Sequence, residues 1–303
     1  MTRHAPIVLF VYNRPTHTRR TVEALLKNEL ARESDLIIYS DAPKKPEVAE
    51  EVREVREYIR TITGFRSVSI AMREKNWGLA NSIIDGVTTV VNKYGRIIVL
   101  EDDLVTSPYF LNFMNTALDT YQDDEKVMHI SGYMFPIDNA DMPETFFLRT
   151  ASCWGWATWN RAWRHFEKNP KKLFNEYTKQ TINRFNLDGA YNFWAQVEQN
   201  GKGLIDTWAV FWYASVFQKG GLCLHPKFSM VSNIGHDETG LHCGNTDIFS
   251  VQLASKPITY FDRNLVEDTQ ALNRIKAFFS PAKPAFFSRV SQVLRRSFYY
   301  NVL

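Results

Sequence analysis

The chain has 303 residues, of which 45% are hydrophobic and 14% aromatic, so it can bury one large core and is globular. Its formal charge of +3 hides a mildly acidic body, because the stretch after Asp268 contains six Lys and Arg and no acidic residue. Proteins that wrap nucleic acid generally need a basic face, so we predict no nucleic-acid partner.

The first apolar run, from residue 6 to residue 12, is too short to cross a membrane and is followed at once by the polar turn 13–15. We therefore expect no signal peptide and no transmembrane helix. The three cysteines lack metal-type spacing, and an odd number argues against a disulfide framework: Cys153, Cys223 and Cys243. These features favour a cytoplasmic protein.

Short apolar runs alternate with helical patterns along the first 125 residues. We expect strands at 7–12, 36–40, 68–71 and 96–100, with helical apolar faces at 22–30, 48–62, 80–94 and 110–121. This alternation predicts an α/β fold with a mainly parallel, doubly wound sheet flanked by helices. The ligand crevice of such a sheet lies at the carboxyl ends of its strands.

Three adjacent carboxylates, Glu101, Asp102 and Asp103, follow the fourth run, where its strand would leave the sheet. They repel one another unless a cation lies there, and a metal that holds phosphates usually takes one or two protein carboxylates. We therefore predict a site for metal-bound phosphate. The alternative is a solvated acidic turn that caps the next helix.

Polar residues also follow the other three runs: Arg14 after the first, Asp41 after the second, and Lys75, Asn76 and Gly78 after the third. No G-x-G-x-x-G follows the first strand and no G-x-x-x-x-G-K-[ST] occurs anywhere, which disfavours a classical dinucleotide site and a P-loop. A nucleotide held by a metal and side chains remains.

The order strand-Asn-Arg, strand-Asp, Lys-Asn-Trp-Gly-Leu-Ala, strand-Glu-Asp-Asp resembles the GT-A nucleotide-sugar glycosyltransferases. It is most similar to the N-acetylglucosaminyltransferase I family, whose metal motif is also Glu-Asp-Asp. The likeness covers roughly residues 6 to 240 and includes Trp154-Gly155-Trp156, Trp163 and the segment 205–208. It departs at Thr207, which replaces a second acid, and after Gly235.

The resemblance implies a GT-A, Rossmann-like fold and a role for each matching residue. It implies Arg14 and Asp41 near the nucleotide base and ribose, and Glu101 and Asp102 near the sugar and ribose. It assigns Asp103 to a Mn²⁺ or Mg²⁺ ion. Lys75, Asn76 and Gly78 belong to the same nucleotide site, Lys75 as a solvated or phosphate-facing charge.

Tryptophans are dense between residues 153 and 163. Most aromatic clusters belong to a core, but a flat apolar ring with one N–H donor also suits the face of a sugar. Gly155 between two indoles indicates close backbone approach. We expect Trp154 or Trp156 at the donor or acceptor sugar, with Gly155 and Trp208 in the same region.

An inverting sugar transfer needs a base for the acceptor hydroxyl and an electrophile for the departing diphosphate. With Asp103 assigned to the metal, Asp206 is the best remaining carboxylate by position and by resemblance, ahead of Glu198 and Asp188. Its alternative role is an N-cap for the aromatic helix at 208–217.

Late in the chain, His236 lies in a Gly-bounded loop, and many GT-A enzymes have a late His that completes the metal or diphosphate site. We put His236 forward as a metal ligand and His242 behind it. The alternative is an exposed loop histidine.

We divide the chain into a nucleotide-sugar-binding half (1–125), an α+β acceptor-binding and catalytic half of the same domain (126–268) and a basic tail (269–303). Beyond Pro284 the tail has apolar residues on one helical face and arginines on the other. This pattern is typical of a C-terminal amphipathic helix on anionic lipid, and a helix docked on the body is an equal alternative.

The sequence therefore predicts an inverting, metal-dependent glycosyltransferase that uses a nucleotide-diphosphate sugar, preferably a UDP-sugar. Its acceptor would be a carbohydrate or lipid-linked glycan in bacterial surface polysaccharide synthesis, at the inner face of the plasma membrane. A sugar nucleotidyltransferase is disfavoured, because it would need a Gly-rich loop with Arg and Lys after the first strand and this sequence has none there. A noncatalytic carbohydrate-binding protein is disfavoured as well, because it would give the three acids at 101–103 no function.

Overall fold

The computed structural model describes residues 4–237 and 247–280. The strands of these residues form one eight-stranded sheet, in the order β3-β2-β1-β4-β8-β6-β9-β7, and a two-stranded ribbon of β5 and β10. Their bounds are β1 Ile7–Val11, β2 Asp35–Ser40, β3 Ser67–Met72, β4 Arg96–Glu101, β5 Leu104–Thr106, β6 Val127–Ser131, β7 Thr145–Leu148, β8 Trp156–Trp159, β9 Leu222–Pro226 and β10 Val231–Asn233.

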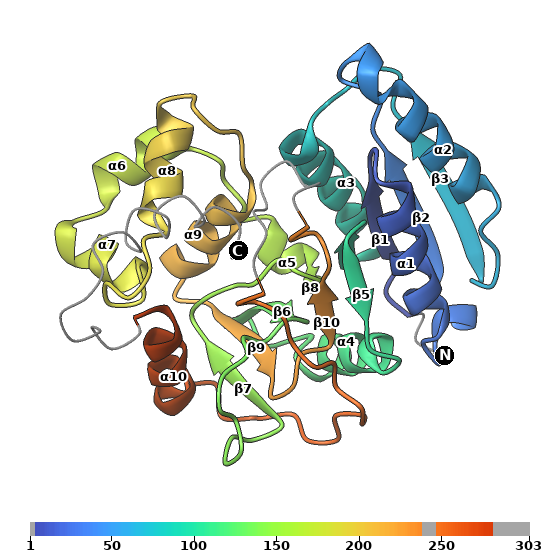
Figure 1. Ribbon diagram of the computed structural model, residues 1–303. Helices are drawn as coiled ribbons and strands as arrows, with labels where there is room; N and C mark the ends of the chain where they lie inside the picture. Colours follow the sequence, from blue (N-terminus) through green and yellow to red (C-terminus); the bar gives the residue numbers. More distant parts are fainter. Residues whose placement is uncertain (1–3, 238–246, 281–303) are drawn as a thin grey trace, which may run out of the picture.

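Helices flank the large sheet, and Figure 1 shows α1–α3 beside β1–β3 on one side of the molecule and α6–α9 on the other. The helices are α1 Pro15–Leu26, α2 Ala49–Arg60, α3 Leu79–Tyr94, α4 Phe110–Thr120, α5 Asn160–Trp163, α6 Pro170–Glu176, α7 Lys179–Phe185, α8 Trp194–Gly201, α9 Ala209–Gln218 and α10 Thr269–Phe279. Two short 3₁₀ turns, Ala31–Glu33 and Pro46–Val48, precede β2 and α2.

The strands β1 to β4 run parallel, with β1 between β2 and β4. All five residues of β1 are buried, as expected for a strand covered by helices on both faces. The expected strands agree with the structure to within one residue at each end. The expected apolar face at 22–30 does not, because α1 ends at Leu26 and Leu30 lies outside it.

The second half of the chain extends the same sheet. Strand β8 runs antiparallel to both β4 and β6, while β6 pairs parallel with β9, and β7 antiparallel with β9. Four of the seven pairings in the sheet are parallel, so the predicted α/β fold with a mainly parallel sheet is confirmed.

The ribbon of β5 and β10 joins two distant parts of the sequence at the end of β4. Thr106, Val105 and Leu104 pair with Val231, Ser232 and Asn233 respectively. The N–H of Ile234 then donates to the carbonyl of Asp103 (2.9 Å), which continues this contact up to the three acids.

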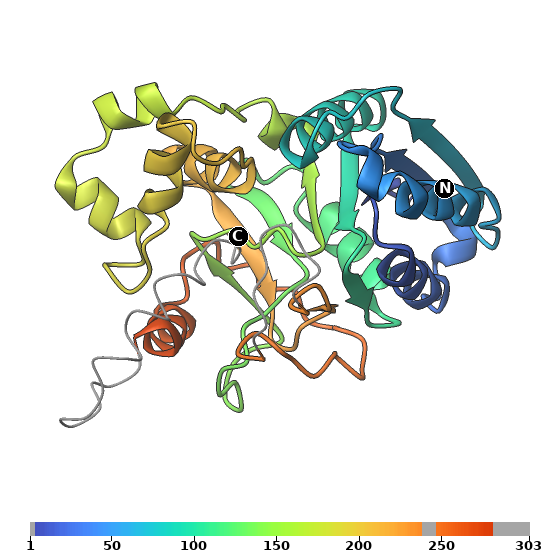
Figure 2. The ribbon, with the colours of Figure 1, turned by 45° about the horizontal axis from the view of Figure 1, so that its top comes forward.

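The first part of the predicted tail is attached to the body. Helix α10 is N-capped by Asp268, whose side chain accepts from the N–H of Ala271, and it lies beside β7 (Figure 2). The ring of Phe279 packs on Tyr191 and Phe135, with centroids 4.7 and 5.1 Å apart. The expected amphipathic helix beyond Pro284 lies outside the described residues.

Two of the three cysteines, Cys153 and Cys223, are buried free thiols, and Cys243 lies outside the described residues. Within residues 4–237 and 247–280, none of the helices has the length and apolar character needed to cross a bilayer.

Candidate active site

The three carboxylates lie where β4 leaves the sheet, as expected. Asp102 is 9% exposed, and its Oδ2 accepts from the N–H of Tyr12 at the end of β1 (3.3 Å). Strand β5 begins at Leu104 and helix α4 only at Phe110, so the acids do not cap the next helix. The alternative interpretation as an acidic helix cap is therefore wrong.

Negative charge is in excess at the end of β4, where three carboxylates lie beside one arginine. Burial raises the pKa of Glu101 well above its ordinary value, and the charges of Asp103 and Asp102 raise it further. Burial and the charge of Asp103 raise the pKa of Asp102 to about 7. Arg14 opposes both shifts. A cation bound among the three acids would relieve this repulsion.

Arg14 occupies the cationic position nearest to Asp103. Its Nη1 donates to Oδ2 of Asp103 (2.9 Å) and its Nη2 to Oδ1 of Asp237 (3.2 Å). The side chains of Arg14 and Asp103 are 12% and 15% exposed, so this ion pair is largely shielded from water. Arg14 also forms the N-cap position of α1, directly after β1.

The loop after β10 lies against this ion pair. A Cβ on Gly235 would overlap Oδ2 of Asp103 and lie 3.0 Å from Nη1 of Arg14. Glycine at this position therefore lets the late loop approach the acids closely. Asp237 follows, and its Oδ2 also pairs with Nε2 of His17 (3.0 Å), a residue on α1 that sequence reasoning missed.

The ring of His236 is placed between two aromatic side chains. It packs on Trp154 and on Phe249, with ring centroids 5.4 and 5.6 Å apart. The residue is thus one position from Gly235, which touches Asp103, but a metal-binding role for His236 stays a prediction. His242 lies outside the described residues.

Asp41 holds the loop between β3 and α3 in place. Its carboxylate accepts from the backbone N–H groups of Ala42, Trp77 and Gly78, at 2.9 to 3.1 Å. The amide of Asn76 also donates to the carbonyl of Ala42 (2.7 Å). These contacts use the acceptor capacity of Asp41 to shape the loop, and Gly78 has a φ of +75° that favours glycine.

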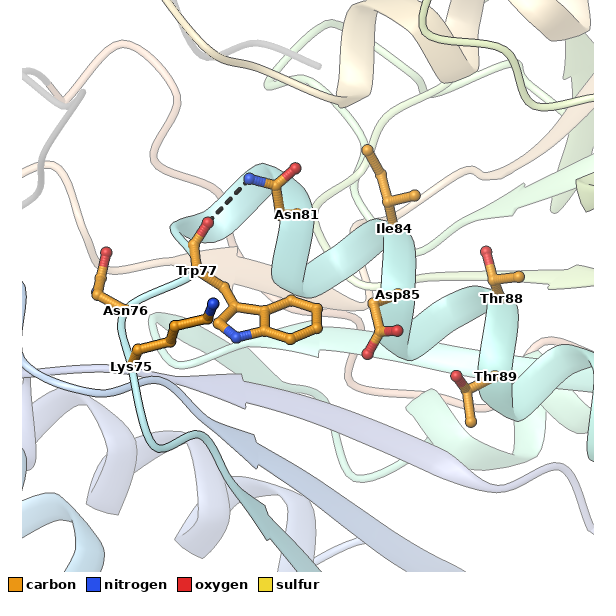
Figure 3. A pocket seen from close by; sticks show the side chains of 8 residues that line it. All are labelled: Lys75, Asn76, Trp77, Asn81, Ile84, Asp85, Thr88 and Thr89. Carbon is orange, nitrogen blue, oxygen red and sulfur yellow. Dashed lines mark hydrogen bonds between the residues drawn. The ribbon is translucent and has the colours of Figure 1, made fainter.

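Lys75 and Asn76 line a pocket of about 610 Å³ along α3, shown in Figure 3. The indole of Trp77 lies beneath Asn81 and extends toward Asp85 in this view. Arg73 stacks on the same indole, 3.9 Å from its centroid, and pairs with Asp85. Lys75 is therefore an exposed residue at the mouth of the crevice beside a fixed aromatic ring.

The tryptophans belong mostly to the core. Trp156 has no exposed surface, and its ring stacks on His129 and on Trp208, each 5.4 Å away between centroids. Trp208 is 3% exposed and Trp154 is 5% exposed. Trp156 and Trp208 are buried and stack on each other, so we do not retain these two as sugar contacts.

Gly155 makes the close approach that its position between two indoles predicts. Its φ is +64°, and a Cβ there would lie 2.7 Å from Cγ1 of Val231. Its carbonyl accepts from the N–H of Gly132 (2.6 Å). The approach is to Val231 of β10, and it brings the base of the late loop onto the start of β8.

Asp206 is exposed and lies in a loop between α8 and α9. In the described part of the chain its carboxylate pairs with Nζ of Lys168, and both line a pocket of about 530 Å³ with Leu204. Helix α9 has Trp208 at its N-cap and no side-chain cap, so the expected capping role of Asp206 is wrong. Trp208 instead anchors the loop by stacking on Trp156, which pairs with Val99 of β4.

The competing carboxylates have different surroundings. Asp188 pairs with Arg149 (3.0 Å) and Lys276 (2.9 Å), which lock it between α7, β7 and α10. Glu198 is exposed on α8. In the described part of the chain, no hydrogen bond or ion pair joins Asp188 or Glu198 to the Glu101–Asp103 segment.

The donor set at the acids suits a metal that also takes ligands from a substrate. Among residues 4–237 and 247–280, no three His, Cys, Asp or Glu side chains are grouped so as to hold a metal ion by themselves. A hard divalent cation prefers oxygen ligands and can take one or two carboxylates together with substrate phosphates and water. The carboxylates at the end of β4 fit that arrangement.

The chain was compared with curated proteins, with solved structures and with family models. No curated protein matches the chain. Among solved structures it is similar to the mannosyltransferase PcManGT of Pyrobaculum calidifontis in complex with GDP-Man and Mn²⁺ (9% identity, 72% of this chain and 70% of that chain, TM-score 0.39). It is also similar to S. aureus TarS (11% identity, 50% of this chain and 28% of that chain, TM-score 0.35).

The model of the GNT-I family matches residues 1–186, which is more than half of the chain. The matched segment includes the acids at the end of β4, Arg14 and the pinned loop before α3. Because the TM-scores of the two solved structures are low, the family assignment rests on the match to the GNT-I model. The chain belongs to the GNT-I family and is a nucleotide-sugar glycosyltransferase.

Proposed function

We propose that this enzyme is an inverting, metal-dependent glycosyltransferase that transfers a sugar from a nucleotide-diphosphate donor, preferably a UDP-sugar, to a hydroxyl of a carbohydrate or lipid-linked glycan. The observation that carries the proposal is the meeting of three carboxylates, Arg14 and the Gly235–Asp237 loop at the end of β4. Opposite charges gathered in this way suit a cation and a diphosphate bound together.

Asp103, with Asp102 beside it, would hold a Mn²⁺ or Mg²⁺ ion, and His236 is the candidate for a further ligand. The ion would supply the positive charge that stabilises the departing diphosphate. The chain's own contribution is to hold the carboxylates at a strand end. Arg14, within hydrogen-bond distance of Asp103, adds a second positive charge for the phosphates.

The rest of the donor would lie along the same edge of the sheet. Lys75, Asn76 and Gly78 belong to the loop whose backbone N–H groups donate to the carboxylate of Asp41. Asp41 would therefore act by fixing the shape of the nucleotide site. Glu101 would face the sugar and ribose. Trp154, whose ring lies beside His236, is the remaining aromatic candidate for a sugar contact.

Asp206 is our candidate for the general base. In the transfer, the acceptor oxygen forms a bond to the anomeric carbon as the bond to the diphosphate oxygen breaks. The acceptor proton passes to the carboxylate of Asp206, and the diphosphate leaves with the bonding electrons. Support comes from the position of Asp206 in an open pocket, where its carboxylate pairs with Nζ of Lys168.

The substitution Asp206→Asn tests this assignment, because it keeps the size of the side chain and removes the proton acceptor. General-base assistance is worth ~10²–10⁴-fold in rate, so kcat should fall by about that factor while nucleoside-diphosphate affinity stays unchanged. Glu198→Gln is the matched control and should retain native turnover.

Near-native turnover of Asp206→Asn would remove Asp206 as the base, and Asp237 would become the next candidate. Analysis of the product's anomeric configuration is independent of that result. A product that keeps the donor's configuration would contradict the inverting mechanism itself.

The setting that we propose is the cytoplasmic face of a bacterial plasma membrane, in surface polysaccharide synthesis. Support comes from the basic, apolar sequence after Pro284, which would hold the enzyme near a lipid-linked acceptor.

A further inference from the structure

We propose that Arg14 is a displaceable counter-ion of Asp103: without donor its guanidinium occupies the carboxylate that the metal needs, and the donor's diphosphate draws it away. Metal and diphosphate would then bind as a coupled pair, and neither would bind well alone. This inference rests on the proposed function and assigns Arg14 a task beyond contact with the nucleotide.

The first step of the argument is the contact itself. Nη1 of Arg14 lies 2.9 Å from Oδ2 of Asp103, and the two side chains are only 12% and 15% exposed. A Mg²⁺–carboxylate bond of about 2.0–2.1 Å needs the same lone pairs. A guanidinium at this site therefore competes with the metal for the oxygen and repels it by charge.

The second step is the limited space around that oxygen. A Cβ on Gly235 would overlap Oδ2 of Asp103, so backbone already covers one side of the carboxylate. The backbone of Ile234 is fixed as well, because its N–H donates to the carbonyl of Asp103 (2.9 Å). An incoming cation thus has to share the remaining side with Arg14 or displace it.

The third step is that the guanidinium of Arg14 has a second carboxylate close by, while the backbone of Arg14 is held in place. Its Nη2 already lies 3.2 Å from Oδ1 of Asp237. Its carbonyl is held by the N–H and the hydroxyl of Thr18, both at 2.9 Å, at the first turn of α1. Only the side chain has to move for Nη1 to leave Asp103.

The last step concerns the ligand. A diphosphate offers paired oxygens that match the planar fork of an arginine, and it also bridges a divalent cation. When phosphate oxygens take over the guanidinium, Asp103 becomes available at the moment when the cation acquires phosphate ligands. Each ligand therefore lowers the free energy of binding the other, and the coupling is reciprocal.

The test measures Mn²⁺ binding by calorimetry or electron paramagnetic resonance, without and with saturating pyrophosphate or UDP. Site-to-site couplings are typically 5–150-fold, and we expect the diphosphate to raise Mn²⁺ affinity by at least about tenfold in the native enzyme. In Arg14→Gln, Mn²⁺ alone should bind about tenfold more tightly, and the gain from diphosphate should shrink by about the same factor.

A matched control removes the same charge elsewhere. Arg96 lies at the start of β4, is 14% exposed and pairs with Asp119. At about 3.3 Å per residue it is ~20 Å from the acids, and Arg96→Gln should leave Mn²⁺ affinity and coupling unchanged. Arg14→Lys keeps the charge but loses the fork, so its coupling should fall between those of the native enzyme and Arg14→Gln.

Equal Mn²⁺ affinity and equal coupling in the native enzyme and Arg14→Gln would overturn the counter-ion role while leaving the proposed metal site intact. A native enzyme that binds neither Mn²⁺ nor diphosphate would instead overturn the proposed function, and this inference with it. Thermal unfolding of each variant confirms that it is folded, and Arg14→Lys replaces Arg14→Gln if the latter is not.

Discussion

Two buried histidines should make the fold sensitive to mild acid. In β6, Nδ1 of His129 accepts from Nε1 of Trp212 and Nε2 donates to the carbonyl of Ser152, both at 3.0 Å. In β9, Nε2 of His225 donates to the carbonyl of Thr150 (2.9 Å). Because Trp212 can only donate and a carbonyl can only accept, His129 is held as one neutral tautomer.

Burial lowers the pKa of His129 to about 3 and that of His225 to about 4, against an ordinary value of 6.5. Since both folded pKa values lie below the unfolded value, the unfolded chain binds these protons first. The stabilisation from neutral histidines is therefore complete above about pH 7.5 and is lost as the pH falls through 6.5.

At pH 5, the loss is about 2 kcal/mol for each histidine, from 1.36 kcal/mol per pH unit over the roughly 1.5 units below 6.5. The two together remove about 4 kcal/mol, a large share of the roughly 5–15 kcal/mol typical of domains. The raised pKa values of Glu101 and Asp102 act in the opposite sense, because the folded state binds those protons first. A comparison between variants therefore isolates the contribution of the histidines.

The assay is urea unfolding of the native protein and His129→Gln at pH 7.5 and pH 5. Between pH 7.5 and pH 5, His129→Gln should lose about 2 kcal/mol less unfolding free energy than the native protein does. His165→Gln removes a partly exposed imidazole whose pKa is lowered by burial and by the charges of Lys219 and Arg164, so it should reduce the native difference by less than His129→Gln does. A His129→Gln protein with the same loss as the native protein would refute the reasoning.

Three further outcomes follow from the site and the fold. Gly155→Ala should cost about 1–3 kcal/mol of stability by overlap with Val231, whereas Gly220→Ala, at a similar φ but in open space, should cost less in the same urea titration. Asp103→Ala should abolish sugar transfer and weaken nucleoside-diphosphate binding in a folded protein, and transfer by EDTA-treated enzyme at the native rate would contradict the metal assignment. Truncation after Ser280 should reduce sedimentation with anionic vesicles, and equal sedimentation would exclude a lipid role.

The positions of β1 to β4 were predictable because buried strands between helices are continuous apolar runs, whereas the parallel pair of β6 and β9 was not predicted. Polar residues follow each of these four runs, and parallel strands end at one edge, so the order of residues along the chain was enough to group Arg14, Asp41 and the acids at 101–103. The fold class followed from the same pattern.

The pattern did not specify what each polar group does. Asp41 accepts from the backbone N–H groups of Trp77 and Gly78, and Trp156 stacks on His129 and Trp208, all of which are distant in sequence. The sequence did not indicate a role for His17, since a single histidine in a helix with an apolar face has many possible partners. The partner that matters, Asp237, lies more than 200 positions away.

The β5–β10 ribbon has a consequence for the order in which the enzyme matures during synthesis. Val231 pairs with Thr106, 125 positions earlier, and this pairing helps to bring the Gly235–Asp237 loop onto the acids. At roughly 5–20 residues per second, a ribosome needs ~6–25 s to make the intervening segment. During that interval the emerging first half carries three adjacent carboxylates without their loop, and a competent donor site can form only after the second half has emerged.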